Sequence, residues 1–214
     1  MPVMLCTILL LLAASFASTG SSGGPQWDLL NGAGFAACAL YIHLSWLSAS
    51  PARQPMLDAH ADLALWICGF AVLHSGGLLV AEPTLLEYLQ ADAPPYMLAG
   101  VMALVMLLAL TWASFPRARQ RVWQSWPAFR SWHKWTWLLL LGAITWHVLG
   151  SGFYFDTTLA RMLGFTALVL LPLGFWTDRR LLRRRPPRPG MEVRHPGIAL
   201  AGLTTLVLFA VTRA

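Results

Sequence analysis

Long apolar segments separated by short polar or proline-rich joints run along the whole chain. An α-helix needs about 20 apolar residues to cross a bilayer, and most segments approach that length. The joints carry the Gly, Ser and Pro residues that commonly end helices. The pattern therefore predicts an all-α fold, a polytopic transmembrane bundle of six or seven helices. The expected helices lie near residues 3–18, 28–48, 60–80, 96–115, 133–152, 158–177 and 196–213.

The same pattern divides the chain into four parts. Residues 1–20 form an N-terminal apolar helix, which is either an uncleaved anchor or a signal peptide. A small-x-small cleavage site at residues 15–17 favours the signal peptide, but Met1 to Leu5 lacks the basic residues that signal peptides carry. We expect the main transmembrane domain at 28–177, a basic loop at 178–195 and a further transmembrane helix at 196–214.

Composition and charge agree with a membrane protein and fix its orientation. Of the 214 residues, 57% are hydrophobic and 11% are charged, whereas soluble domains have about 25% charged residues. Loops 49–59, 116–134 and 178–195 hold 13 of the 15 Lys and Arg residues. These loops are predicted to be cytoplasmic, in a multi-pass protein of the plasma (inner) membrane. The excess of basic over acidic residues thus reflects topology and contact with anionic lipid in the bilayer. No nucleic-acid partner is expected.

Four of the six histidines form two pairs with the same spacing. His60 and His74 are 14 residues apart on the expected third helix, and His133 and His147 are 14 apart on the fifth. Fourteen steps of about 100° end within about 40° of complete turns, so each pair shares one helix face, with a rise of about 21 Å. Both helices run outward from the cytoplasm. His60 should therefore face His133 at one depth, and His74 should face His147 at another.

Two opposed imidazoles at one depth predict an axial ligand set for haem iron. The sequence therefore predicts two stacked b haems between the third and fifth helices, with His60, His74, His133 and His147 as iron ligands. Zinc fits less well because it needs three or four converging ligands. The chain has no HExxH motif, and its three cysteines form no CxxC or CxxCH.

Neighbouring residues suit this interpretation, although each also has a simpler explanation. Arg130 and Lys134 flank His133 and could pair with the anionic haem propionates, or they could simply follow the positive-inside rule. The glycines of the two helices could make room for a flat ring or serve ordinary helix packing. These glycines are Gly69, Gly76, Gly77, Gly142 and Gly150.

The remaining histidines have other expected roles. His43, alone on the second helix, is expected to be packed or hydrogen-bonded, and His195 lies in a basic loop where it is expected to be solvated. Two alternative functions involve no haem. One is a haem-free transporter or proton path through the intramembrane histidines. The other is a structural or assembly subunit of a membrane complex.

Two stretches resemble a known family. Leu65 to His74, continuing to Leu78-Leu79 and Glu82, resembles the third helix of the bacterial MsrQ (YedZ) haem subunit. Trp126 to His147 resembles its fifth helix, with a basic loop, a histidine that opens the helix and a second histidine near its far end. Residues 28–177 are thus similar to the ferric reductase-like transmembrane domain, a haem-binding membrane unit.

The chain also differs from the MsrQ type. That type has one residue fewer between its fifth-helix histidines, and it lacks a ligand at the position of His60. Paired histidines on both helices are closer to eukaryotic ferric reductases and NADPH oxidases, and the helix at 196–213 is an addition. The resemblance therefore supports the haem scaffold and does not extend to a methionine sulfoxide reductase partner.

The resemblance implies a membrane cytochrome b, a component of an oxidoreductase. Electrons would come from a cytoplasmic flavoreductase or from a quinol, with FMN or FAD on a partner or at the cytoplasmic face. They would leave to an extracytoplasmic acceptor such as a periplasmic redox protein or a ferric chelate. Such outer-sphere transfer needs no acid–base residue, and no catalytic residue is predicted.

Overall fold

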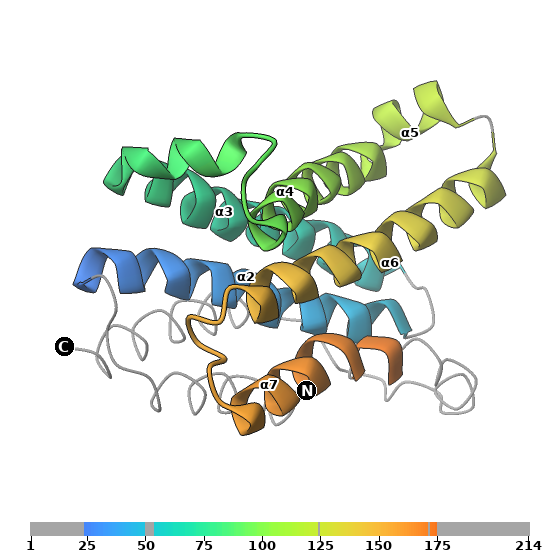
Figure 1. Cartoon of the computed structure of the whole chain (residues 1–214). Helices are drawn as coiled ribbons and strands as arrows, with labels where there is room; N and C mark the ends of the chain where they lie inside the picture. The colour runs from blue at the N-terminus through green and yellow to red at the C-terminus, as the bar shows by residue number, and fades with distance from the viewer. Residues whose placement is uncertain (1–23, 50–53, 124, 171, 175–214) are drawn as a thin grey trace.

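The computed structural model describes residues 24–49, 54–123, 125–170 and 172–174 (Figure 1). All secondary structure in these ranges is helical, as the apolar pattern predicts. The expected helices at 3–18 and 196–213, the basic loop at 178–195 and His195 lie outside the described residues. The long helices are α2 (Pro25–Ala49), α3 (Gln54–Ala81), α4 (Pro95–Ser114) and α6 (Trp126–Gly150).

Shorter helices connect and cover the long ones. A 3₁₀ helix, η1 (Pro83–Leu89), links α3 to α4, and α5 (Pro116–Val122) links α4 to α6. After α6, the chain forms α7 (Thr158–Phe165), which continues as the π-helical segment η2 (Thr166–Leu170). The Thr157 side chain caps α7 by accepting a hydrogen bond from the backbone N–H of Ala160 at 3.1 Å.

The predicted start of the fifth helix is wrong. The region from 116 up to the helix expected at 133–152 was predicted to be a loop, but it contains α5 and the first turns of α6, so Arg130 is helical. Helix α6 begins early because Ser125 accepts a hydrogen bond from Ala128 N–H, and Pro127 suits the first turn. Apolar content marks only the lipid-embedded part of a helix, and α6 extends beyond it.

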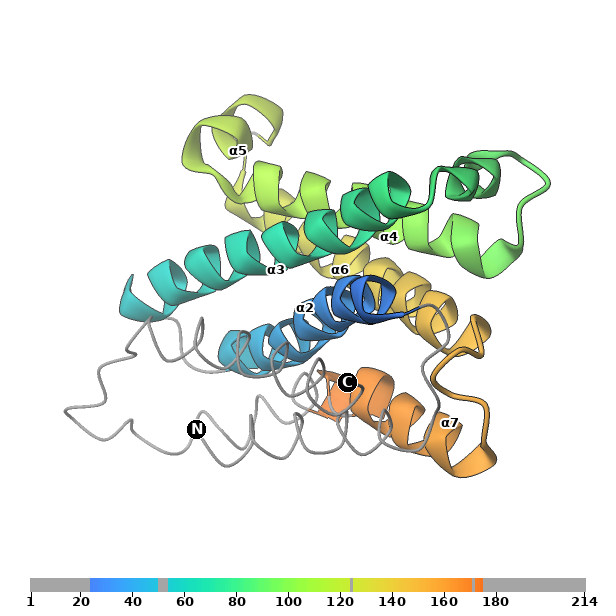
Figure 2. The ribbon, with the colours of Figure 1, turned by 90° about the vertical axis from the view of Figure 1, so that its left-hand side faces the viewer.

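The four long helices form two antiparallel hairpins. Helices α3 and α6 run in the same direction, and α2 and α4 run in the opposite direction (Figure 1). Helix α2 lies between α3 and α7 (Figure 2), so both of its sides are covered. Every residue from Phe35 to Ser45 is accordingly buried.

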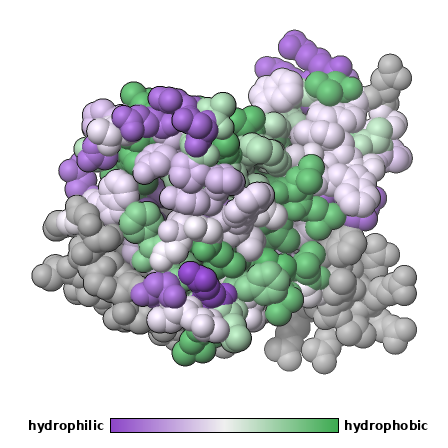
Figure 3. Space-filling view, viewed as in Figure 1, coloured by the Kyte–Doolittle hydropathy of each residue, from purple (hydrophilic) through white to green (hydrophobic). Residues whose placement is uncertain are grey.

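Many apolar side chains face outward, as expected where lipid is the solvent. The exposed apolar residues of α3 and α6 include Trp66, Val80, Trp135, Leu139 and Trp146. Hydrophilic residues gather over α5 and η1, at opposite ends of the hairpins (Figure 3). Within the described residues, Asp58–Ala81 and Pro95–Ser114 are long and apolar enough to cross a membrane. The architecture is that of a helical membrane domain.

Candidate functional site

The structure brings the four predicted histidines together in the predicted pairs. The ring centres of His60 and His133 are 6.3 Å apart, with an angle of 49° between the ring planes. We call this the first pair. The ring centres of His74 and His147 are also 6.3 Å apart, with an angle of 65°, and form the second pair. Both pairs connect α3 with α6, and they are about 21 Å apart along the helices.

The separation of the imidazoles fits an iron atom between them. A bond of about 2.0–2.1 Å from an imidazole nitrogen to a metal, plus about 1.1 Å from that nitrogen to the ring centre, gives about 6.3 Å between the centres of two opposed ligands. Both pairs have this separation. The ring-centre separation is therefore compatible with one metal atom between the two imidazoles of each pair.

The ligand set also suits haem better than a bare ion. Among the described residues, no three His, Cys, Asp or Glu side chains gather closely enough to hold a metal ion. Two imidazoles are sufficient for iron that already has four porphyrin nitrogens. The residues present therefore fit two bis-histidine haems.

Hydrogen bonds to the backbone fix the orientation of the second pair. His74 Nδ1 lies 3.0 Å from the carbonyl oxygen of Leu30 in α2. His147 Nδ1 lies 3.0 Å from the carbonyl oxygen of Tyr96 in α4. A carbonyl oxygen only accepts, so Nδ1 must carry the proton in both rings. In the neutral imidazole, Nε2 then keeps its lone pair for a metal.

Glycines on the neighbouring helices allow these close contacts. A Cβ atom at Gly34 of α2 would lie 3.0 Å from Cγ and Nδ1 of His74. A Cβ at Gly100 of α4 would lie 2.5 Å from Nδ1 of His147. The sequence predictions missed both glycines, which lie on helices without a proposed ligand. Their signal in the sequence was the offset of 66 positions between Gly34 and Gly100, beside the offset of 73 positions between His74 and His147.

The glycines that were considered from the sequence have other surroundings. Gly69 and Gly142 each lie nine residues after a histidine of the first pair, about 180° around the helix, so they do not make room beside the pairs. Gly77 packs against the Leu30 side chain, and Gly150 packs against Tyr96. The last two serve helix packing.

A cluster of aromatic rings packs beside His133 of the first pair. The ring centre of buried Phe129 is 5.4 Å from that of His133. Trp123 lies 5.4 Å from Phe129 and 4.6 Å from Trp132. His133 Nδ1 is buried and has no hydrogen-bond partner among the described residues. Packing, rather than a carbonyl acceptor, therefore holds this imidazole.

The basic residues near the first pair lie at the surface. Arg130 and Lys134 are exposed, and the Lys134 ammonium lies 5.4 Å from the centre of the Trp135 ring. Arg130 lies three residues before His133 and shares its side of α6, whereas Lys134 is turned about 100° away. Their contact with a propionate stays a prediction. Arg119 of α5, which the sequence did not single out, lies over the Trp126 and Phe129 rings at 4.7 and 5.6 Å.

Apolar side chains fill the space between the two pairs. Ile67 lies midway between His60 and His74, and Leu140 lies midway between His133 and His147. These two residues are 2% and 0% exposed and belong to the same buried cluster. His43 of α2 is also buried, at 1% exposure, which agrees with its expected packing role.

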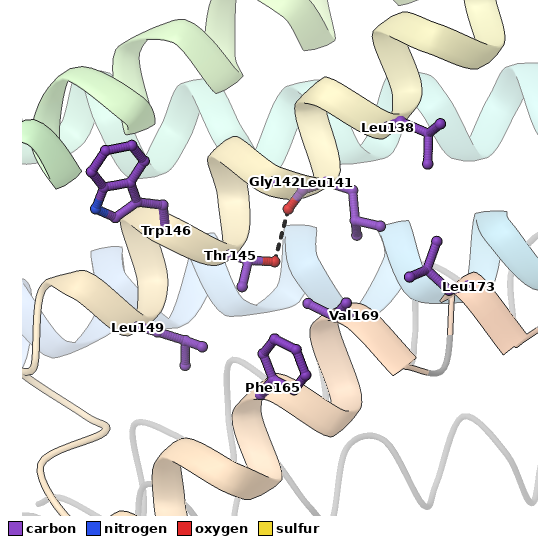
Figure 4. Close-up of a pocket in the computed structure, with 9 residues that line it drawn as sticks. All are labelled: Leu138, Leu141, Gly142, Thr145, Trp146, Leu149, Phe165, Val169 and Leu173. Carbon is purple, nitrogen blue, oxygen red and sulfur yellow. Dashed lines mark hydrogen bonds between the residues drawn. The ribbon is translucent and has the colours of Figure 1, made fainter.

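A separate apolar cavity of about 520 Å³ lies between α6 and the α7–η2 segment (Figure 4). Its walls include Leu138, Thr145, Phe165 and Val169, and the Thr145 hydroxyl donates to the carbonyl oxygen of Leu141 at 2.8 Å. The cavity lies on the side of α6 opposite the histidines. Its lining has no titratable side chain, so it offers no acid–base chemistry.

One comparison with known proteins gives a match. The family model described as Ferric reductase like transmembrane component matches residues 33–144. The matched segment covers most of α2, all of α3 to α5 and most of α6, including His60, His74 and His133, and it ends three residues before His147. No curated protein and no solved structure gives a significant match.

Proposed function

Because the chain belongs to the family of ferric reductase like transmembrane components, we propose that it carries electrons across the membrane through two b-type haems. At the family level, membership indicates membrane electron transfer. The haems, their ligands and the direction of transfer are our proposal for this chain. His60 and His133 would hold one haem, and His74 and His147 the other.

The observation that supports this proposal most strongly is the equal separation of the two imidazole pairs. Ring centres 6.3 Å apart occur twice, and this value suits two axial nitrogens on one metal. Two imidazoles from the same two helices face each other at each depth, which is the arrangement that a pair of axial ligands requires. The recurrence at two depths favours a pair of equivalent centres over two coincidental packing contacts.

The protein residues supply binding, orientation and insulation. When bound, haem supplies a reversible one-electron couple between ferric and ferrous iron. The carbonyl oxygens of Leu30 and Tyr96 hold the second pair with Nε2 available. Ile67 and Leu140 exclude water from the space between the pairs. A dry, preorganised surrounding favours fast outer-sphere transfer because little has to rearrange.

The basic loops indicate the proposed direction. With 13 of 15 basic residues in three loops on one side, we place that side in the cytoplasm. The first pair then lies nearer the donor, a flavoreductase, a flavin at the cytoplasmic face or a quinol. The second pair lies nearer an extracytoplasmic redox protein or ferric chelate.

Proteoliposomes test this function directly. The purified full chain would be inserted into vesicles that contain ferricyanide, and a membrane-impermeant reduced flavin would be added outside. We expect reducible Soret and α bands and loss of the internal ferricyanide. The matched His74→Ala protein should keep one haem but transfer electrons much more slowly, because an essential centre is missing.

Other results would select the alternatives. A purified protein without a reducible Soret band would contradict the haem proposal and favour a transporter or a structural subunit. Normal haem spectra without ferricyanide reduction in vesicles of either orientation would contradict transmembrane transfer.

A further inference from the structure

The two helix hairpins repeat the same arrangement around the second pair. Leu30 and Gly34 of α2 correspond to Tyr96 and Gly100 of α4, each 66 positions later. His74 and Gly77 of α3 correspond to His147 and Gly150 of α6, each 73 positions later. Most residues between these positions differ, so the correspondence is hard to see in the sequence.

The contacts repeat as well as the spacing. In each hairpin, the histidine Nδ1 lies 3.0 Å from the carbonyl oxygen of the residue four positions before the glycine. In each, that glycine faces the imidazole without a side chain between them. In each, the glycine three positions after the histidine packs against the side chain of the residue whose carbonyl oxygen accepts this hydrogen bond. The α2–α3 and α4–α6 hairpins thus orient their histidines through the same set of contacts.

We propose that Gly34 and Gly100 are equivalent positioning residues that set the orientation and tautomer of the haem ligands His74 and His147. This inference rests on the proposed function. The carbonyl cannot be altered by substitution, but the glycine controls how closely the helix approaches the ring. Without a Cβ, the backbone of α2 or α4 comes close enough for Nδ1–H to donate to the carbonyl.

The distances predict an unequal response to an added methyl group. At Gly100, a Cβ would lie 2.5, 2.7 and 2.9 Å from Nδ1, Cε1 and Cγ of His147, so the ring must move. At Gly34, the shortest distances to His74 are 3.0 Å, and a smaller shift is sufficient. Substitution at Gly100 should therefore disturb the second haem more than substitution at Gly34.

Four matched variants test the proposal in the full-length protein. Gly34→Ala and Gly100→Ala add a methyl group against a ring, whereas Gly69→Ala and Gly142→Ala add one where nothing lies within 4 Å. All four glycines are helical and have ordinary backbone angles, so the change in helix propensity is the same. The readouts are haem content by pyridine haemochrome, low-temperature EPR of the oxidised protein and a redox titration.

We expect Gly100→Ala to lower the affinity of the second site for haem by about 10- to 100-fold, as loss of an orienting partner commonly does. Gly34→Ala should lower it less, with a shifted EPR signal and midpoint potential for the second haem. The first haem should stay unchanged in both variants, which also reports correct folding. The two control variants should match the unmodified protein.

Three results would overturn the inference or separate it from the proposed function. Identical spectra and potentials in all variants would overturn it, and equal loss of both haems in Gly34→Ala and Gly100→Ala would assign the glycines to helix packing alone. If the unmodified protein bound no haem, the proposed function would fail instead.

Redox-difference infrared spectra of unmodified protein with labelled histidine provide a check without mutation. They should show a hydrogen-bonded Nδ1–H at the second haem, and a free Nδ1–H there would contradict the positioning role.

Discussion

The two histidines of α6 have the same partner geometry but different support. His147 donates from Nδ1 to a carbonyl oxygen on α4 and packs against the bare backbone of Gly100. His133, 14 residues earlier on the same helix, lies against Phe129, and its Nδ1 has no hydrogen-bond partner among the described residues. Both rings nevertheless stand 6.3 Å from an imidazole on α3.

This difference shows two ways to place a ligand in a membrane bundle. The second pair is oriented by hydrogen bonds, so its tautomer is set before a ligand binds. His133 of the first pair is placed by aromatic packing, which fills volume but does not choose the protonated nitrogen. The His133 side of the first site should therefore be more sensitive to the packing around α5 and the start of α6.

Removing a ligand of the second pair should give the largest change in haem content and the clearest difference between the two histidine pairs. His74→Ala or His147→Ala should each reduce haem content by about one per chain, because an open axial position weakens binding. The haem held by His60 and His133 should remain, since centres about 21 Å apart share no ligands. Pyridine haemochrome and EPR measure this. Loss of both haems in either variant would show that the sites are not independent.

Removing the aromatic side chain beside His133 should weaken haem binding at the first pair only. Phe129→Ala leaves a cavity beside His133 and should lower the free energy of unfolding in detergent by about 3–5 kcal/mol. The first haem should bind more weakly, and the EPR signal of the second should stay the same. Leu139→Ala, at a residue that is 64% exposed on the same helix, is the control and should change stability by about 0.5 kcal/mol or less. An equal change in both haems would contradict separate support.

Removing the neighbouring cations should have the smallest effect. Arg130→Ala removes a positive charge near the first pair, which makes the ferric form relatively more stable. The midpoint potential of that haem should fall by about 20–40 mV, as an exposed ion pair is worth about 0.5–1 kcal/mol. Lys134→Ala should shift it less, because Lys134 is turned away. A redox titration checks this, with the second haem as internal reference. An unchanged or higher potential would contradict a contact between Arg130 and a propionate.

Much of this fold follows from the sequence because lipid exposure makes helices visible as apolar runs. The bounds of α4 differ from the predicted segment by one residue at each end, whereas α3 begins six residues before its predicted start. The start of α6 was missed because Arg130, Ser131 and Lys134 lower the local hydropathy while the helix continues under the Ser125 cap.

The pairing of histidines could also be predicted, since it depends only on helix phase and direction. His60 and His74 are 14 residues apart, so they share one face of a straight helix whatever fold surrounds it. The residues whose backbone orients the second pair could not be predicted in this way. A backbone carbonyl has no residue identity, and Leu30 and Tyr96 lie 44 and 51 positions from the histidines that they orient. Comparison of the chain with itself at the 66- and 73-residue offsets would have given the signal.

The stoichiometry of haem in the unmodified protein and in His60→Ala tests the central claim most directly. His60 is the ligand that separates two bis-histidine sites from a three-histidine arrangement. We expect pyridine haemochrome assays to give two haems per chain in the unmodified protein and about one in His60→Ala, with the EPR signal of the second haem retained. An unchanged haem content and spectrum in His60→Ala would show that His60 is not a ligand and would contradict the account.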